Sequence, residues 1–150
     1  MLQSPYITRL LGTSREGDSL LFFLEPVLGG TLHQHLRRMP GAHLDEGTVA
    51  LYTAELLSAL AHMHSRGCIH RDLKASNCIL DQEGHIKLCD FSAAKVLSST
   101  PTSSPAPRSF TVIGTIEFMS PEMLLRTVGY SFATDVWSLG ERSHCVPFVS

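Results

Sequence analysis

A short polar run near the middle of the sequence contains the side chains that phosphoryl transfer requires. Residues 70–77 read His-Arg-Asp-Leu-Lys-Ala-Ser-Asn, and Asp90 opens the sequence Asp-Phe-Ser one short strand pair later. Asp72 is a candidate base for a hydroxyl proton, and Lys74, two residues on, can neutralise a transferring phosphate. Asn77 and Asp90 supply the oxygen ligands that magnesium prefers, and magnesium bridges nucleotide phosphates. This spacing indicates phosphoryl transfer from ATP.

Each of these side chains has a simpler interpretation when it is taken alone. Asp72, Asn77 and Asp90 are residue types that commonly cap turns. His62 and His64 could suggest a metal site, but a two-residue spacing directs them to different faces of a helix. We therefore expect His64 to form a buried structural hydrogen bond. The chemical interpretation of the polar run depends on several motifs occurring in order.

The composition is that of a soluble globular chain with one compact core. The sequence has 150 residues, of which 43% are hydrophobic and 17% charged. This length is too short for two ordinary domains. The formal net charge of -2 gives no electrostatic reason to expect a nucleic acid or an anionic membrane as partner.

Export and membrane insertion are not predicted from the sequence. The first residues lack a basic flank and an apolar segment, and no apolar run approaches the length of a membrane span. The cysteines show no paired-ligand spacing, which favours reduced thiols, and Cys89 is interpreted as a buried filler rather than a reactive thiol. We expect a cytoplasmic protein, with the nucleus as an alternative location.

The first part of the chain predicts a hairpin followed by a short helix. Apolar, β-prone runs at 6–11 and 20–24 flank a polar segment that contains glycine, which is typical of a hairpin. Thr31 follows a pair of glycines and can cap a helix that turns Leu32 and Leu36 inward.

Elements on either side of the polar run must position it. A long amphipathic helix is expected from Asp45 until Gly67 stops it. Its buried stripe comprises Val49, Tyr52, Leu56, Leu60 and Met63. Short strands are expected at 78–80 and 85–89, joined by a turn, and a last helix begins near Thr134.

One segment differs in kind from the rest. Residues 98–109 are rich in serine, threonine and proline, and such a composition cannot bury enough apolar surface to become ordered. We interpret it as a flexible insert within one domain. A linker between two domains is the alternative, but little sequence follows it.

In this order, the motifs resemble those of a eukaryotic protein kinase catalytic domain. Thr-Val-Ile-Gly-Thr at 111–115 and Ser-Pro-Glu at 120–122 follow the catalytic-loop run and the Asp-Phe-Ser motif. The resemblance covers residues 4–140 and is greatest with AGC-group serine/threonine kinases, near their ribosomal-protein-kinase branch. It implies an α+β, protein-kinase-like fold, with a mostly helical large lobe and a β-hairpin remnant of the small lobe.

The resemblance implies an adenine site formed by the first hairpin and the strand after the catalytic loop. Leu24 would occupy the gatekeeper position, and the backbone of Glu25 and Val27 would face the base. Ile79 would form the apolar floor of the site, as purine binding requires. ATP and Mg²⁺ are the implied cofactors.

The resemblance also implies a set of regulatory and supporting residues. Thr111 stands where related kinases carry the activation-loop phosphosite, and a phosphate there could pair with Arg71. Thr115 would contact the catalytic aspartate and lysine, a feature associated with serine/threonine specificity. Asp135 would cap and hold the backbone of the catalytic loop.

Three positions depart from the family pattern. Ser92 replaces the glycine after Asp90-Phe91, which restricts the backbone freedom of that motif. Thr31 and Ser76 stand where arginine-directed AGC kinases carry glutamates. We therefore predict no preference for arginine in the substrate.

The resemblance is incomplete at both ends of the chain. The resemblance identifies residues 25–27 as the hinge that binds adenine. No glycine-rich loop, strand lysine or helix glutamate precedes this hinge, although phosphoryl transfer by kinases uses all three. Residues 1–140 are interpreted as a partial kinase domain, from the fourth small-lobe strand to the start of the central large-lobe helix. Residues 141–150 are interpreted as a divergent tail, in which Glu141-Arg142 and Pro147 would not continue the last helix.

The implied function is phosphorylation of serine or threonine hydroxyls in a protein substrate, with weak or no activity from this chain alone. An upstream activating kinase and a chaperone are possible partners. A non-catalytic kinase-like binding module or decoy is the alternative function. A third alternative is a product that does not fold stably.

Overall fold

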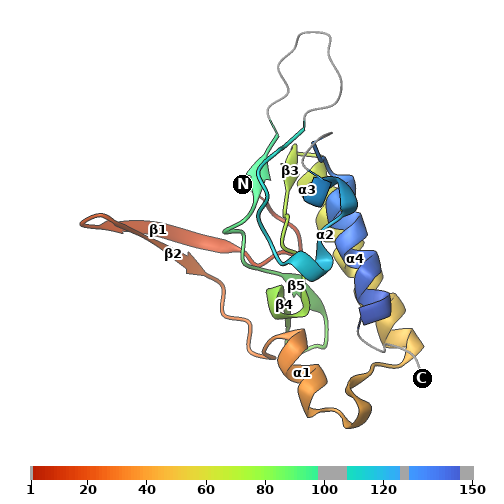
Figure 1. Cartoon of the computed structure of the whole chain (residues 1–150). Coiled ribbons are helices and arrows are strands. Elements are labelled where there is room, and N and C mark those ends of the chain that lie inside the picture. Colours follow the sequence, from red (N-terminus) through yellow and green to blue (C-terminus); the bar gives the residue numbers. More distant parts are fainter. Residues whose placement is uncertain (1, 98–107, 126–128, 146–150) are drawn as a thin grey trace.

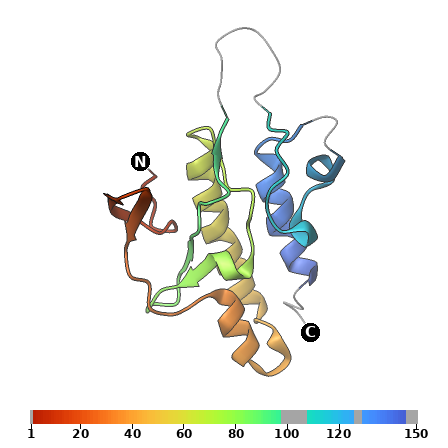
Figure 2. The ribbon, with the colours of Figure 1, turned by 60° about the vertical axis from the view of Figure 1, so that its left-hand side comes forward.

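Two long helices lie side by side at the centre of the described structure. The computed structural model describes residues 2–97, 108–125 and 129–145, with residues 42 and 141–145 described through their backbone alone. Helix α2 (Glu46–His64) packs along α4 (Ala133–Cys145), and the shorter elements surround this pair (Figures 1 and 2). The described elements combine helices with short antiparallel strand pairs, as the predicted α+β fold requires.

Local signals at both ends of α2 explain where it begins and ends. Asp45 is the N-cap, and its Oδ1 accepts a hydrogen bond of 3.0 Å from the Thr48 N–H, which satisfies a donor that the helix itself leaves unpaired. The helix ends at His64 with Ser65 as its C-cap, and Gly67 follows with φ of +69°, a conformation that glycine adopts without steric cost. The predicted helix is confirmed.

Helix α1 (Leu32–Arg38) begins at a capping box. Thr31 accepts a hydrogen bond from the Gln34 N–H, and the Gln34 side chain accepts one from the Thr31 N–H. Leu32 and Leu36 are buried, as their helical spacing predicts. A short 3₁₀ turn (Pro40–Ala42) then leads to α2.

Two small strand pairs bracket the catalytic-loop sequence. Strand β4 (Cys78–Leu80) pairs antiparallel with β5 (Ile86–Leu88), as predicted. Strand β3 (Cys68–Ile69) pairs with β6 (Lys95–Val96), a contact that the sequence pattern did not predict. The loop between β3 and β4 is therefore held at both ends by backbone pairing.

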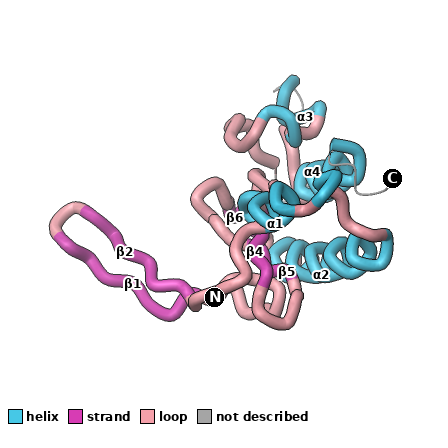
Figure 3. Tube along the Cα trace, turned by 90° about the horizontal axis from the view of Figure 1, so that it is seen from below, coloured by secondary structure: helices cyan, strands magenta, loops and turns pink. Residues whose placement is uncertain are grey.

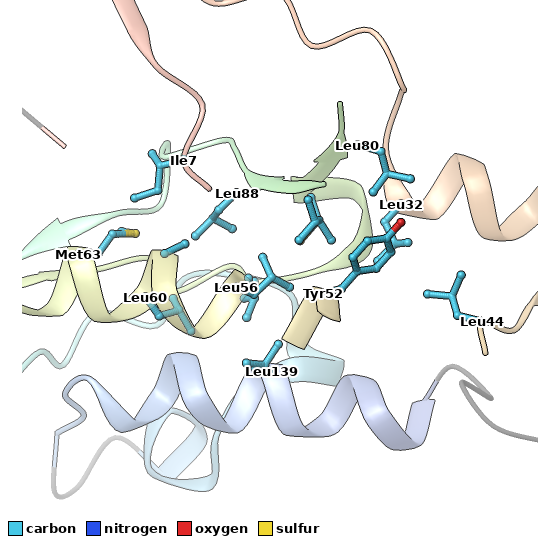
Figure 4. Packing of buried hydrophobic residues seen from close by; sticks show 14 of the residues in the cluster. Ile7, Leu32, Leu44, Tyr52, Leu56, Leu60, Met63, Leu80, Leu88 and Leu139 are labelled. Carbon is cyan, nitrogen blue, oxygen red and sulfur yellow. The ribbon is translucent and has the colours of Figure 1, made fainter. Parts of the chain in front are cut away.

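The main core lies between α2, the β4–β5 pair and α4. The predicted stripe of α2 contributes four buried residues, Tyr52, Leu56, Leu60 and Met63. Val49 is half-buried at the edge of the stripe. Figure 4 shows Leu139 reaching this cluster from α4 and Ile7 reaching it from the N-terminal segment. This core sets the distance between α2 and the β4–β5 pair that follows the catalytic loop.

A buried carboxylate in α2 was not predicted. Glu55 is 4% exposed; its Oε1 lies 2.5 Å from Nδ1 of His85, and its Oε2 accepts a 2.9 Å bond from the Ile86 N–H. The pair ties the turn between β4 and β5 to α2. The hydrogen bond and the charge of Glu55 raise the pKa of His85 above its usual value of 6.5.

This pair predicts a pH-dependent contribution to stability. Because the pKa of His85 is higher in the folded chain, its contribution is complete below the unfolded pKa, about 6.5, and is lost as the pH rises through the folded value. We expect the difference in unfolding free energy between the parent and His85→Gln to shrink as the pH rises from the unfolded pKa of His85 through its folded pKa. Urea unfolding at several pH values measures this difference. His35→Gln is the control because His35 is exposed on α1. A difference that grows with pH would contradict the assignment.

The β1–β2 hairpin projects away from the rest of the structure (Figures 1 and 3). Strand β1 (Leu10–Glu16) pairs antiparallel with β2 (Ser19–Leu24). A hairpin was predicted, but the predicted first strand at 6–11 starts too early, because Ile7 instead packs in the core and bridges Leu88. All of β2 is exposed, including Phe22 at 61%.

One further expectation from the sequence is wrong, and another lies mostly outside the described residues. Helix α4 continues through Glu141-Arg142 to Cys145, because glutamate and arginine are good helix formers and one glycine at 140 costs only about 1 kcal/mol. Pro147 lies outside the described residues. Residues 98–107 of the predicted insert also lie outside them, but Ser109 is buried and forms an antiparallel bridge with Tyr130.

The segment after this bridge lies over the catalytic loop. It contains a 3₁₀ turn (Ile116–Phe118) and helix α3 (Pro121–Leu125). A second, smaller hydrophobic cluster joins it to the β3–β6 pair and to the start of α4: Ile69, Leu97, Met119, Met123 and Tyr130.

Candidate active site

Asp135 holds the backbone of the catalytic loop from α4. Its carboxylate is fully buried and accepts three hydrogen bonds, from Nε2 of His64 at 2.8 Å, from the His70 N–H at 2.9 Å and from the Arg71 N–H at 2.8 Å. The bond to His64 is the structural hydrogen bond that the sequence predicted. Arg71 has φ of +70°, a region that non-glycine residues seldom adopt, and these bonds stabilise it there.

His70 links the loop to the Asp-Phe-Ser segment. Its Nε2 lies 3.1 Å from the Cys89 carbonyl, and its Nδ1 lies 3.3 Å from the Asp72 N–H. These partners require a neutral ring with the proton on Nε2. Burial lowers the pKa of His70, which keeps the ring neutral.

Asp72, Lys74 and Thr115 form a closed triangle of polar contacts. The Lys74 Nζ lies 2.7 Å from Asp72 Oδ2 and donates to Thr115 Oγ1 at 2.9 Å, and the Thr115 hydroxyl donates to Asp72 Oδ1 at 2.7 Å. Burial alone would raise the pKa of Asp72, but the bonds from Lys74 and Thr115 outweigh it and lower that pKa. Asp72 is therefore ionised at neutral pH.

Asn77 and Asp90, the two predicted magnesium ligands, lie at the ends of adjacent strands. The Asn77 Nδ2 donates to the Asp72 carbonyl at 2.9 Å and to Asp72 Oδ2 at 3.0 Å, so both of these bonds use the amide nitrogen and not the amide oxygen. The Asn77 carbonyl accepts from the Cys89 N–H at 2.9 Å, so Asp90 follows directly beside it. Asp90 has φ of +58°, and its Oδ1 accepts from the Ser92 N–H at 3.2 Å.

The predicted adenine-site residues lie at the base of the hairpin and on β4. Leu24 ends β2 and is exposed, and Val27 is half-buried in the segment that follows. Hydrogen bonds from Lys87 and the Arg9 N–H outweigh burial and lower the pKa of Glu25. Thr31 bridges Ile79 on β4, so the segment after the hinge is attached beside the predicted floor.

Each of the three lysines in the sequence already has a side-chain partner. Lys74 contacts Asp72, Lys87 donates to Glu25 at 3.0 Å, and Lys95 donates to Ser109 Oγ at 3.1 Å. The described residues thus offer no lysine that could take the place of the strand lysine found in kinases.

Thr111 is exposed, and the structure connects it to Arg71 through a residue that sequence reasoning missed. The Arg71 Nη1 donates to the Tyr130 hydroxyl at 3.0 Å, and this hydroxyl donates to the Thr111 carbonyl. Arg71 Nε also donates to the Ala93 carbonyl at 2.6 Å. No spacing rule connects Tyr130 with a loop 59 residues before it.

Gly114 is the second missed position. It has φ of +117°, and a Cβ there would lie 2.3 Å from the Arg71 carbonyl. The backbone at Gly114 therefore lies so close to the catalytic loop that only a residue without a Cβ fits there. The glycine in Thr-Val-Ile-Gly-Thr was the available signal.

The arrangement matches a known family. The protein kinase domain family matches residues 1–145 of the chain. The chain belongs to the protein kinase family. The triangle at Asp72, the paired positions Asn77 and Asp90, and the buried Asp135 are therefore parts of a kinase domain, and the relatives are protein kinases.

Its relatives come from more than one kinase group. The chain is 39% identical over 139 residues to mitogen-activated protein kinase kinase kinase 3 of Arabidopsis thaliana, covering 93% of this chain and 20% of that protein. It is 37% identical to human 3-phosphoinositide-dependent protein kinase 1, with 93% and 24% covered. It is 40% identical to ribosomal protein S6 kinase beta of Caenorhabditis elegans, with the same coverage of 93% and 24%. These matches do not single out one branch of the family.

The kinase chain spans only about a fifth to a quarter of these relatives' lengths, 20% to 24%. Among its described helices, none has the length and apolar character needed to cross a membrane.

Proposed function

We propose that this chain is part of a serine/threonine protein kinase that transfers the γ-phosphate of ATP to a hydroxyl of a protein substrate. The observation that carries the proposal is the position of the Thr115 hydroxyl. It donates to Asp72 and accepts from Lys74. A substrate hydroxyl needs an acceptor for its proton and a nearby cation for the transferring phosphate, and this pair offers both to an oxygen placed between them.

Asp72 acts mainly by orienting the substrate hydroxyl. Its lowered pKa makes it a weak base at neutral pH, so it can accept a proton only as the hydroxyl becomes acidic late in the transfer. Asn77 fixes the Asp72 carboxylate through a hydrogen bond from its Nδ2 to Oδ2, and Lys74 supplies positive charge at the same oxygen. Positioning and electrostatics account for most of the acceleration in this reaction class.

The donor set at Asn77 and Asp90 fits a magnesium ion. Amide and carboxylate oxygens are hard ligands, and a magnesium ion bound by few protein groups takes its other ligands from nucleotide phosphates and water. Asn77 and Asp90 would hold the ion. When bound, magnesium neutralises charge on the phosphates.

Regulation by phosphorylation of Thr111 and an activating kinase as partner are further parts of the proposal, and the exposure of Thr111 and its connection to Arg71 support them. Placement in the AGC group is also proposed, on the sequence resemblance alone. We also propose that the chain alone has weak or no activity, because the described lysines are all engaged.

A kinase-like binding module is the second candidate. The exposed apolar surface of the hairpin favours it, since large exposed apolar surface marks interaction sites. Its members are Leu11, Leu20, Leu21, Phe22, Phe23 and Leu24.

A thermal melt with and without Mg·ATP tests the nucleotide site. We expect saturating Mg·ATP to stabilise the parent chain by about 2–3 kcal/mol at a hundredfold excess over Kd and to leave Asp90→Ala unshifted. Asp81→Ala is the matched control, because Asp81 lies in the β4–β5 turn and caps it. This variant should still respond to Mg·ATP even if its own melting temperature is lower.

Three results would contradict parts of the proposal. A parent chain that ignores Mg·ATP, or an Asp90→Ala variant that responds like the parent, would contradict a nucleotide site at these residues. Phosphate transfer to a protein substrate that survives Asp72→Ala would contradict the role of Asp72.

A further inference from the structure

The side chain of Tyr130 joins three segments that are far apart in the sequence. Its ring is 2% exposed within the second hydrophobic cluster. Its hydroxyl accepts a 3.0 Å hydrogen bond from Arg71 and donates to the Thr111 carbonyl. One phenol thus holds the catalytic loop and residues 109–111 to the start of α4. These residues belong to the activation segment, the name that the kinase family gives to the stretch at 90–122.

Neighbouring contacts hold the same segment. Ser109 and Tyr130 exchange backbone hydrogen bonds of 2.8 and 2.9 Å, and Lys95 donates to the Ser109 hydroxyl at 3.1 Å. The residues from 109 to 111 are therefore anchored without any phosphate. Within the described residues, the Tyr130 hydroxyl is the side-chain group that connects this anchor to Arg71.

The guanidinium of Arg71 lacks an anionic partner. Arg71 is 9% exposed, and its described side-chain acceptors are the Ala93 carbonyl and the Tyr130 hydroxyl, both neutral. Within the described residues, no carboxylate lies at ion-pair distance from it. A buried cation with neutral partners is stabilised further by an anion, and the Tyr130 hydroxyl occupies one of its donors.

We propose that Tyr130 is a positioning residue: while Thr111 is unmodified, the Tyr130 hydroxyl holds residues 109–111 against Arg71. When residue 111 carries an anion, that anion replaces the Tyr130 hydroxyl as the partner of the Arg71 guanidinium. This inference depends on the proposed function at one point, the assignment of Thr111 as the phosphorylated residue. The phenol and the anion are then alternative partners of one guanidinium. The activation segment stays near the catalytic loop in both states.

Amide hydrogen exchange of the 150-residue chain tests the contact without requiring catalysis. In Tyr130→Phe, which keeps the ring, we expect protection of the Ser109 and Tyr130-position amides to fall by about five- to tenfold, as loss of one buried hydrogen bond allows. The control is Tyr52→Phe, which removes the hydroxyl of another buried tyrosine. The amides of α2 should lose no more protection in Tyr130→Phe than they lose in this control. Two results would overturn the proposal. One is a loss of protection in α2 as large as the loss at residues 109 and 130, and the other is unchanged protection at residues 109 and 130.

A rescue experiment separates positioning through Arg71 from simple packing. Thr111→Glu combined with Tyr130→Phe should restore at least half of the lost protection, because its carboxylate can pair with Arg71. Thr111→Gln combined with Tyr130→Phe should not restore it, because glutamine has the shape of glutamate without its charge. Equal protection in the Glu and Gln versions would overturn the proposal. Because these readouts use no nucleotide, they can succeed even if the Mg·ATP test fails, and the reverse also holds.

Discussion

Replacing Asp135 by alanine is expected to lower the free energy of unfolding by about 3–5 kcal/mol. Its fully buried carboxylate accepts bonds from His64 and from the backbone N–H groups of His70 and Arg71. Alanine would leave two buried N–H groups without an acceptor, each costing about 1–3 kcal/mol. It would also release the positive φ of Arg71. Urea unfolding followed by far-UV circular dichroism measures the loss.

Val136→Ala is the matched control for this prediction. Val136 is the next residue of α4 and is 49% exposed, so its truncation should change stability by less than about 0.5 kcal/mol. Since domains of this size have only about 5–15 kcal/mol of stability, Asp135→Ala should show a clearly lower urea midpoint or no cooperative transition. A midpoint equal to that of Val136→Ala would show that Asp135 does not organise the loop.

Replacing Gly114 by alanine is expected to cost about 3 kcal/mol and to displace the activation segment from the catalytic loop. The new Cβ would lie 2.3 Å from the Arg71 carbonyl, and the φ of +117° is unfavourable for any residue with a Cβ. The chain must shift, and Thr115 must leave Asp72 and Lys74. Urea unfolding measures the cost, and exchange of the 115–119 amides reports the displacement.

Gly140→Ala is the control for the glycine substitution itself. Gly140 lies within α4, and a Cβ there would meet nothing within 4 Å. Alanine should stabilise this helix by about 0.5–1 kcal/mol. The two glycine variants should therefore change stability in opposite directions. Loss of stability in both, or in neither, would contradict the close-approach argument at Gly114.

Local signals in the sequence account for most of the elements. Asp45 and Thr31 cap α2 and α1, and the apolar stripe of α2 is buried as its spacing predicts. These predictions succeed because capping and amphipathic spacing involve residues a few positions apart. The early start predicted for β1 failed because the apolar run at 6–11 joins the main core through Ile7 instead.

The errors at the end of the chain have a different cause. The expectation that Glu141-Arg142 would interrupt α4 assumed a buried helix, but helix formation by the backbone depends on propensity, which is high for both residues. Ser109 was included in a flexible insert on composition alone. Its backbone bonds to Tyr130 order it, and composition contains no information about such a partner.

By itself, the sequence determined the chemistry that the site can offer and the local elements that carry it. An aspartate, a lysine and two oxygen ligands at fixed spacing define that chemistry whatever the rest of the fold. The family resemblance implied that Asp135 holds the catalytic loop, but only the tertiary structure showed its bonds and added Tyr130 and the close approach of Gly114. The contacts of these three residues join segments that are far apart along the chain. Whether a carboxylate, a phenol or a missing Cβ meets a given backbone atom depends on how the helices pack, which no local pattern specifies.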